Sequence, residues 1–281
     1  MERKKSGTGR RSTILLVFFL LAGLSLLLYP TVSDWWNSMH QSRAIASYLD
    51  DVVELDEASY EALWRQAQDY NAALPRDDTR FIPTEEQSAA YQSALNISGN
   101  GIMGYLEIPK ISVELPIYHG TGETVLQVAA GHVEGSSLPV GGAGTHCVLS
   151  GHRGLPSATL FTDLDQLQEG DTFQIHVLDE VLTYEVDQIH VVEPDDVSLL
   201  AISEGEDLCT LVTCTPYGVN SHRLLVRGHR VETQAESGGL LHVVADAVRI
   251  DPRLVTPVIG GVLLGVILLW VLIAPFGRRR K

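Results

Sequence analysis

The chain has 281 residues, of which 45% are apolar and 20% are charged. This composition excludes a collagen-like, a low-complexity and a fully disordered chain. The formal net charge is −15, and the basic residues gather at the two ends of the sequence. Residues 31–253 hold 11 basic and 34 acidic residues, a formal charge of −23. Because an acidic surface repels phosphate groups, we expect no nucleic-acid partner.

Two uncharged apolar segments flank this acidic region. Residues 14–30 follow a basic tail, residues 1–13, and could be either a cleaved signal peptide or a retained membrane anchor. A bulky tryptophan pair follows soon after and makes a poor cleavage site, which favours retention. Residues 254–276 are long enough to span a hydrocarbon core of about 30 Å and end at the basic tail, residues 277–281.

The basic tails predict how the chain is oriented in the membrane. Positively charged flanks stay on the cytoplasmic side of a membrane segment. We therefore expect two transmembrane helices with both termini in the cytoplasm. The acidic region between them is then extracytoplasmic and tethered at both ends.

The acidic region begins with a helical extension, residues 31–73, in which apolar residues recur at helical spacing. Asp56 can cap a second helix, so the pattern predicts a break between two helices that act as a stalk or a buttress. Residues 74–100 lose this periodicity and contain two prolines, which predicts an unusually long loop.

From residue 101 to 235 the pattern is that of strands. Short apolar or alternating segments are separated by Gly, Pro and Asp turns, with short helices expected at 123–130 and 159–167. Seven or eight short strands with few helices predict a mainly β fold, a closed β-barrel. Residues 236–253 are expected to link the barrel to the second membrane segment. The predicted strands are 104–109, 114–120, 145–152, 171–178, 181–192, 209–214 and 223–231.

Three side chains in the predicted barrel suggest nucleophilic catalysis. Cys214 ends a strand, and Arg223 opens the next strand of a hairpin that brings it back toward the thiol. An arginine there can donate several hydrogen bonds to a developing oxyanion. His152 ends an earlier strand and supplies a base, although His222 and His229 flank the hairpin and are rivals for that role. The cysteine and histidine spacings do not predict a zinc site.

The same residues carry a resemblance to a known family. The sequence TLVTCTPYGVNSHR, residues 210–223, resembles the TLxTC…R signature of sortase transpeptidases. LSGHRG, residues 149–154, is similar to their histidine motif, and residues 104–110, 115–120 and 131–139 also look like the family. The second membrane segment, the helical extension and the phrase TPYGVNSHR resemble class C, the pilus-assembling sortases.

The resemblance implies a reaction and its residues. Cys214 is expected to be the nucleophile, His152 the general acid and base, and Arg223 the transition-state stabiliser. The substrate is a pilin or other surface protein with an LPxTG-like C-terminal signal, cut between Thr and Gly to leave a thioester. An amine then resolves the thioester: a pilin lysine, or a cell-wall precursor in an anchoring sortase. The resemblance implies no cofactor and no metal.

Two readings outside the family remain open. A membrane-tethered cysteine peptidase would use the same thiol and histidine but hydrolyse the acyl-enzyme. A non-enzymatic adhesin or stalk would not need the thiol at all.

Class C sortases also resemble one another in a lid with an Asp-Pro-aromatic motif, in which the acid contacts the catalytic arginine. The corresponding stretch here, residues 76–81, has no Asp-Pro pair, and we call it the lid segment. Asp77, Asp78 and Phe81 are the candidate lid residues, and whether they plug the site stays open.

Strand parity predicts on which face the other two thiols lie. Cys147 precedes His152 by five residues, and Cys209 precedes Cys214 by five. Because side chains alternate between faces, each should point away from its catalytic neighbour. The resemblance to the sortase barrel implies that these two strands are neighbours, so we expect the pair to lie close together at similar depth, either as two buried thiols or as a disulfide.

Overall fold

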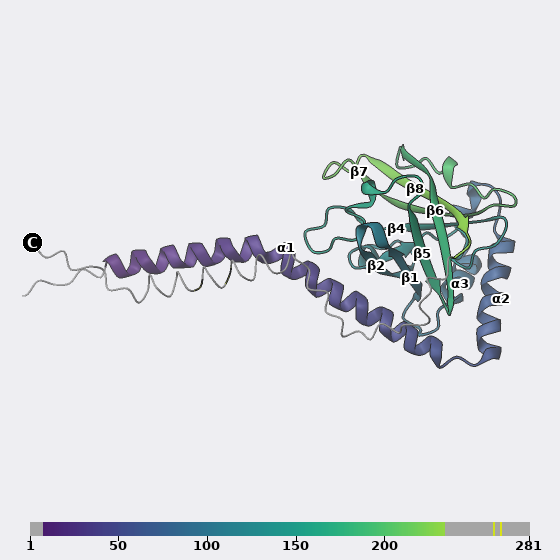
Figure 1. Cartoon of the computed structure of the whole chain (residues 1–281), viewed down its shortest axis with the longest axis horizontal. Coiled ribbons are helices and arrows are strands. Elements are labelled where there is room, and N and C mark those ends of the chain that lie inside the picture. The colour runs from purple at the N-terminus through teal and green to yellow at the C-terminus, as the bar shows by residue number, and fades with distance from the viewer. Residues whose placement is uncertain (1–7, 234–260, 262–264, 266–281) are drawn as a thin grey trace, which may run out of the picture. The chain divides into compact units, whose positions relative to one another are not determined.

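The computed structural model describes residues 8–233 together with 261 and 265 (Figure 1). The chain divides into two units, and the boundary falls between Ser33 and Asp34. Among the residues that the structure describes, the first unit includes the start of helix α1, Thr8–Val53, and the second holds the strands. The predicted membrane segment at 254–276 lies outside the described residues, apart from Gly261 and Gly265.

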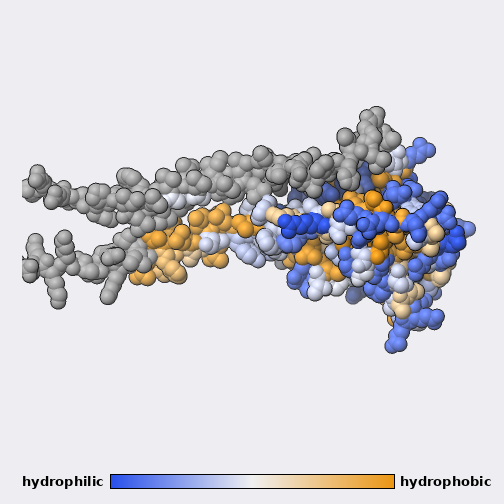
Figure 2. Space-filling model, turned by 90° about the horizontal axis from the view of Figure 1, so that it is seen from below, coloured by the Kyte–Doolittle hydropathy of each residue, from blue (hydrophilic) through white to orange (hydrophobic). Residues whose placement is uncertain are grey.

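Helix α1 contains the segment in which the sequence predicts an N-terminal anchor. Within the described part of the chain, it is the one helix long and apolar enough to cross a membrane, over Leu15–Val53. Its first half exposes large apolar side chains, and Figure 2 shows them as apolar surface along the helix. The sequence predicted an anchor followed by a separate extension, but one helix runs through both and contains Pro30. The exposed apolar residues of this half include Leu15, Leu16, Phe18, Phe19, Leu26 and Leu27.

The second half of α1 packs on the barrel. The buried Tyr48 hydroxyl donates to the carbonyl oxygen of Met103 at 3.2 Å and accepts from the amide of Leu178 at 2.7 Å. The predicted break follows at Asp56, whose carboxylate accepts from the amide of Ser59 at 2.7 Å and caps helix α2, Glu57–Ala73. The prediction of two helices joined at this residue is confirmed.

Residues 74–100 are not the continuous loop that the sequence predicted. They contain a 3-10 helix, η1 (Asp78–Phe81), and helix α3 (Glu85–Ser93). Thr84 and Gln87 form a reciprocal capping box at the start of α3. This Thr-x-x-Gln signature was present in the sequence, and the weak apolar pattern of α3 concealed the helix that follows it. The buried Tyr91 fastens α3 to the barrel, because its hydroxyl donates to the carbonyl oxygen of His132 at 3.0 Å.

The strands form the closed barrel that the sequence predicted, in the order β1-β2-β3-β4-β7-β8-β6-β5. All seven predicted strands are present. The eighth, β3, spans three residues and was too short to show a pattern. The strand bounds are β1 Ile102–Ile108, β2 Val113–His119, β3 Ala130–His132, β4 Thr145–Ser150, β5 Thr172–Val177, β6 Glu180–Val192, β7 Asp207–Thr215 and β8 His222–Val231.

The expected short helices are shorter than predicted. Helix α4 covers Glu123–Leu126, and the segment 159–167 holds only the 3-10 helix η3, Leu164–Gln166. Two further 3-10 turns are η2, Pro109–Ile111, and η4, Ser198–Leu200.

The barrel interior is the main hydrophobic core. Alternate residues of the long strands point inward, as the period of two requires. On β7 the inward residues include Cys209 and Leu211, whereas Val212 belongs to a second cluster on the outer face. We call this second set the outer-face cluster. Its members are Val148, Leu200 and Leu225, with Phe81, Val133, Val192, Val197, Leu199 and Val212 packed against them.

Candidate active site

The site begins with a cross-strand pair. Cys214, near the end of β7, is the register partner of Arg223 on β8. Directly opposed residues of an antiparallel pair share a face, with Cβ atoms roughly 5 Å apart. Cys214 lies two residues beyond Val212, so the pair belongs to the outer face of the barrel. Arg223 Nη1 donates to the carbonyl oxygens of His222 at 3.1 Å and Asn220 at 3.4 Å.

The parallel pairing of β4 with β7 brings His152 to the same level. The ladder extends to Ser150 opposite Val212, and the amide of Gly151 donates to the carbonyl oxygen of Val212 at 3.0 Å. The Thr213 hydroxyl donates back to the carbonyl oxygen of Gly151 at 2.8 Å. These bonds extend the contact between the two chain segments to Gly151 and Thr213, the residues directly before His152 and Cys214. The three predicted side chains therefore come from adjacent strand ends.

The glycines on both sides of His152 let the chain approach neighbouring segments closely. A Cβ on Gly151 would lie 2.7 Å from the ring of Phe161. Gly154 has φ +76°, and a Cβ there would lie 2.8 Å from the ring of Tyr217, in the turn that follows Cys214. The loop after the histidine and the turn after the thiol are thus in direct contact.

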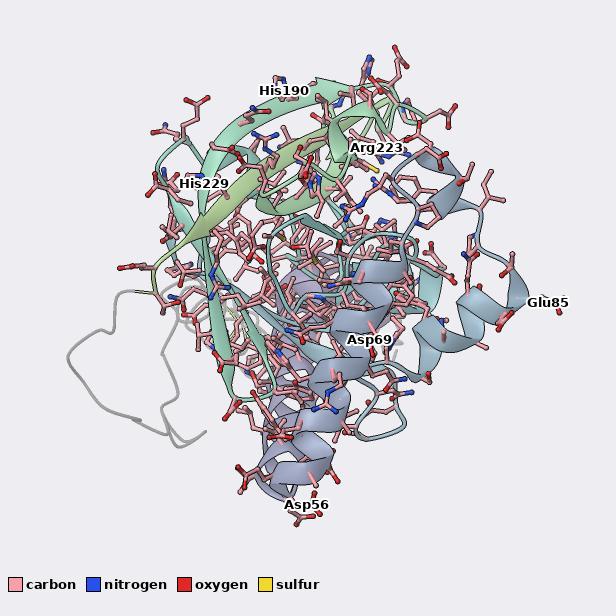
Figure 3. All side chains as sticks on the ribbon, turned by 90° about the vertical axis from the view of Figure 1, so that its right-hand side faces the viewer. Asp56, Asp69, Glu85, His190, Arg223 and His229 are labelled. Carbon is pink, nitrogen blue, oxygen red and sulfur yellow. The ribbon has the colours of Figure 1, made fainter. Side chains whose placement is uncertain are left out.

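The rival histidines lie elsewhere. His222 pairs with Thr215, so it points to the face opposite Cys214 and Arg223. His229 pairs with Leu208 at the other end of β7, and Figure 3 places it well apart from Arg223. Strand register thus favours His152 as the partner of the thiol.

His152 and His222 each lie close to a carboxylate. His152 Nε2 lies 3.6 Å from Glu123 Oε2, and His222 Nε2 lies 3.5 Å from Glu193 Oε1. The sequence analysis did not single out Glu123, because α4 lies far from the histidine motif along the chain. Only the fold brings them together.

The lid segment lies against the outer face of the barrel. Phe81 packs on the outer-face cluster that leads along β7 and β8 to Cys214 and Arg223. Asp77 and Asp78 are exposed, and Asp77 accepts from the amide of Thr79 at 3.1 Å to cap η1. The buried member of the segment is Arg80, which the sequence analysis did not select.

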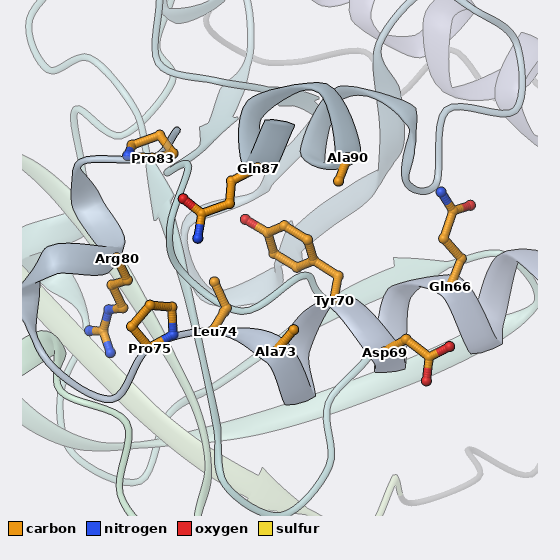
Figure 4. A pocket seen from close by; sticks show the side chains of 10 residues that line it. All are labelled: Gln66, Asp69, Tyr70, Ala73, Leu74, Pro75, Arg80, Pro83, Gln87 and Ala90. Carbon is orange, nitrogen blue, oxygen red and sulfur yellow. The ribbon is translucent and has the colours of Figure 1, made fainter. Parts of the chain in front are cut away.

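Arg80 is 3% exposed, and its Nη2 donates to the carbonyl oxygen of Leu200 at 2.6 Å. Its Nε and Nη1 are buried without a hydrogen-bond partner among the described residues. The side chain also borders a cavity of about 290 Å³ between α2, α3 and the lid segment (Figure 4). The lid segment therefore buries Arg80 while part of that side chain's hydrogen-bonding capacity stays unused among the described residues. The cavity is lined by Gln66, Asp69, Tyr70, Ala73, Leu74, Pro75, Arg80, Pro83, Gln87 and Ala90.

A neutral histidine is buried on β4, whose outer face carries the cluster. His146 donates from Nδ1 to the carbonyl oxygen of Ala201 at 2.9 Å, and its Nε2 accepts from the Thr210 hydroxyl at 2.7 Å. Burial, reinforced by the charges of Arg80 and Arg227, lowers its pKa from 6.5 to about 4. His146 therefore stays neutral and acts as structure.

The other two thiols confirm the parity argument. Cys147 and Cys209 are register partners, both are buried in the barrel interior, and both are free thiols. Burial raises the pKa of the Cys209 thiol well above its ordinary value. Of the two arrangements that the sequence left open, the structure has the pair of buried thiols. Among the described residues, no group of three or more His, Cys, Asp or Glu could hold a metal ion.

The chain is similar to known proteins in both sequence and fold. Residues 106–231 match the model of the Sortase domain. Sortase D of Bacillus subtilis is 34% identical over 131 residues, which is 46% of this chain and 63% of that protein. The chain therefore spans less than two thirds of this relative.

Two solved structures match over nearly their full length. Sortase C1 from Streptococcus agalactiae is 52% identical with a TM-score of 0.64, covering 68% of this chain and 99% of that one. Sortase C from Streptococcus pneumoniae, a structure described for its pilin substrate specificity, is 47% identical with a TM-score of 0.60, covering 68% of this chain and 97% of that one.

Proposed function

Because the chain belongs to the sortase family of cysteine transpeptidases, we propose that it joins surface proteins through an LPxTG-like sorting signal. The observation that supports this most directly is the convergence on one outer face of Cys214, its register partner Arg223, and His152 at the same level. A thiolate, a proton donor and a rigid cation at adjacent strand ends are the parts that acyl transfer needs.

The first half-reaction breaks the peptide bond after Thr. The Cys214 thiolate attacks the Thr carbonyl carbon, and a C–S bond forms as the carbonyl oxygen gains negative charge. Arg223 donates hydrogen bonds to that oxygen. When the tetrahedral species collapses, the C–N bond to Gly breaks, and the leaving amine takes a proton from the His152 imidazolium. The product is a thioester on Cys214.

The second half-reaction restores the enzyme. An acceptor amine attacks the thioester carbon and gives its proton to the neutral His152 imidazole. The C–N bond forms, the C–S bond breaks, and sulfur leaves as thiolate. The chain thus ends with the same protons and charges with which it began. Water must be outcompeted at this stage, since it would hydrolyse the thioester instead.

For the acceptor we favour a lysine of another pilin subunit. Similarity to sortase C1 and sortase C, the latter described for its pilin substrates, supports this choice, as does the helical extension before the barrel. Cell-wall peptide is the alternative acceptor. Sortase D, one of the proteins similar to this chain, is named with another class letter than sortase C. The two acceptors share the first half-reaction and differ only in the amine.

We also propose that the barrel is extracytoplasmic and tethered at both ends. The apolar first half of α1 supports an N-terminal anchor, and residues 254–276 supply the second segment. The basic tails then lie in the cytoplasm. Both substrates of such an enzyme would reach it on the outer side of the membrane.

The test uses the full chain in detergent with a pilin that carries an LPxTG-like signal. We expect covalent ladders in a denaturing gel, and none with Cys214→Ala. Replacing the pilin's acceptor lysine should remove the ladders but leave the thioester. Transfer to cell-wall peptide with no ladders would favour the anchoring reading, and hydrolysis as the sole outcome would favour a peptidase.

A further inference from the structure

Two carboxylate–histidine pairs flank the Cys214–Arg223 pair. They have nearly the same separation, 3.6 Å for Glu123 with His152 and 3.5 Å for Glu193 with His222. Their histidines differ in orientation, because His222 points to the face opposite the thiol, whereas His152 lies beside it. One pair can therefore act on the reaction, and the other provides a natural comparison.

Glu123 is held in place from several sides. It opens α4, and its Oε1 accepts from Gln127 Nε2 at 2.9 Å, which leaves Oε2 for His152. The end of the same segment is fixed by Gln41 of α1, whose Nε2 donates to the carbonyl oxygen of Val128 at 2.7 Å.

The chain before α4 is equally constrained. It runs so close to β3 that a Cβ on Gly131 would lie 2.4 Å from the carbonyl oxygen of Gly120. The hydrogen bond from Gln127, together with the positive charge that His152 can carry, lowers the pKa of Glu123. The Glu123 carboxylate is therefore ionised, and its Oε2 is directed at His152.

We propose that Glu123 is a positioning residue for His152, whose carboxylate turns the imidazole toward the thiol and stabilises the imidazolium form. This inference rests on the proposed function, in which His152 gives a proton to the leaving amine and takes one from the acceptor. A fixed negative charge at Nε2 raises the population of the imidazolium–thiolate pair from which the first half-reaction starts, and it favours proton uptake by the neutral imidazole in the second. Nδ1 is then the ring nitrogen that faces the reacting groups.

The exposure of the pair sets the size of the effect. The His152 side chain is 27% exposed and that of Glu123 is 71% exposed. Because exposed ion pairs are weak and screened by solvent, we expect a change in rate of only roughly two- to fivefold. Salt screens such a pair, since the Debye length falls from roughly 20 Å at low ionic strength to about 4 Å near 0.5 M.

The test is Glu123→Gln in the full chain, which keeps the shape and removes the charge. The matched control is Glu193→Gln. Two rates are measured at low and high salt: turnover of a peptide carrying an LPxTG-like signal, and alkylation of Cys214 by iodoacetamide, which needs no substrate. For Glu123→Gln we expect kcat and the alkylation rate to fall roughly two- to fivefold at low salt, with KM unchanged. At high salt the variant should approach the wild type.

The outcomes separate the two proposals. Wild-type rates for Glu123→Gln at low salt would overturn the positioning role while leaving the proposed function intact. Equal losses in both variants would also overturn it, because a general field effect does not depend on which histidine is paired. A loss that persists at high salt would mean structural damage rather than positioning. If the wild type does not cleave the peptide, the proposed function fails, and the alkylation rates still decide the role of Glu123.

Discussion

Cysteines lie on both faces of the sheet formed by β4 and β7, and their surroundings differ. On the inner face of β4 and β7, Cys147 and Cys209 are paired in register and sealed in the apolar core. On the outer face, five residues along β7, Cys214 meets an arginine across the ladder and a histidine beside it. An odd offset along a strand is enough to separate a thiol buried in the core from the thiol that we propose as the nucleophile.

The comparison also explains why the outer face needs a cover. The inner face is closed by the barrel itself, whereas the outer-face cluster is apolar and would otherwise meet water. Phe81 of the lid segment packs on it, and the neighbouring Arg80 is buried with its Nε and Nη1 nitrogens lacking a hydrogen-bond partner in the described part of the chain. Such groups cost about 1–3 kcal/mol each, so the cover is held weakly compared with the core.

The largest effects should come from replacing the thiol of Cys214 on the outer face, which affects activity, and that of Cys209 on the inner face, which affects stability. Cys214→Ala is expected to abolish the thioester and all covalent product, while the urea midpoint stays near that of the wild type. Cys209→Ala should do the reverse, keeping the chemistry and lowering stability by about 1–2 kcal/mol, because it opens a small gap in a packed core. Activity surviving in Cys214→Ala would refute the assignment of the outer face.

The second prediction concerns the arginine opposite the thiol. Arg223→Lys keeps the positive charge but loses the planar group that can donate two parallel hydrogen bonds. We expect kcat to fall roughly a hundredfold, as it does when one oxyanion donor is lost. Measuring kcat with a saturating sorting-signal peptide checks this. Near-normal turnover in the lysine variant would reduce Arg223 to a general positive charge.

The third prediction concerns His146, which is buried on β4 and stays neutral. Its pKa is lowered from 6.5 to about 4, so the unfolded chain takes up this proton before the folded chain does. The stability that neutral His146 contributes is complete above about pH 6.5 and is lost as the pH falls toward 4, by about 3 kcal/mol in all.

Urea unfolding at several pH values tests this with His146→Gln. The variant should lose stability less steeply than the wild type between about pH 6.5 and 4. The exposed His190 offers the control, since His190→Gln should follow the wild-type curve. Parallel curves for wild type and His146→Gln would contradict the assignment of a buried neutral imidazole.

The smallest effect should come from the cover of the outer face. Phe81→Ala removes apolar contact, and we expect alkylation of Cys214 to become a few times faster. Arg80→Met removes the unpaired buried donors and should make alkylation slower, since the cover then closes at a lower cost. Rates measured with iodoacetamide check both. If the two variants shift the rate in the same direction, it is wrong that Phe81 holds the lid segment on the barrel while the buried Arg80 weakens its closure.

Much of the fold could be read from local pattern. Seven strands alternate clearly, Asp56 is a well-placed cap, and the glycines around His152 mark a close approach. The candidate site residues are also short-range features, a cysteine and a histidine at strand ends and an arginine after a turn, and the resemblance to the family singled them out. Strand parity gave the face of Cys147 and Cys209, and the resemblance supplied the neighbouring strands that bring the two thiols together.

What escaped the sequence depends on contacts between distant segments. The three residues of β3 form a strand only because β2 and β4 lie on either side of them. Arg80 is buried by the contact of the lid segment with Leu200, 120 residues further along the chain. Glu123 is a candidate site residue only because the fold places it near His152, which lies on another element. A single sequence holds no pattern for such pairings.

The most direct test of the account is to trap the acyl-enzyme. The full chain is incubated with a peptide carrying an LPxTG-like signal but without an acceptor amine, then digested and mapped by mass spectrometry. The account predicts one acyl adduct, on Cys214, with Cys147 and Cys209 unmodified until the barrel is unfolded. An adduct on either inner thiol, or cleavage of the peptide by Cys214→Ala, would contradict it.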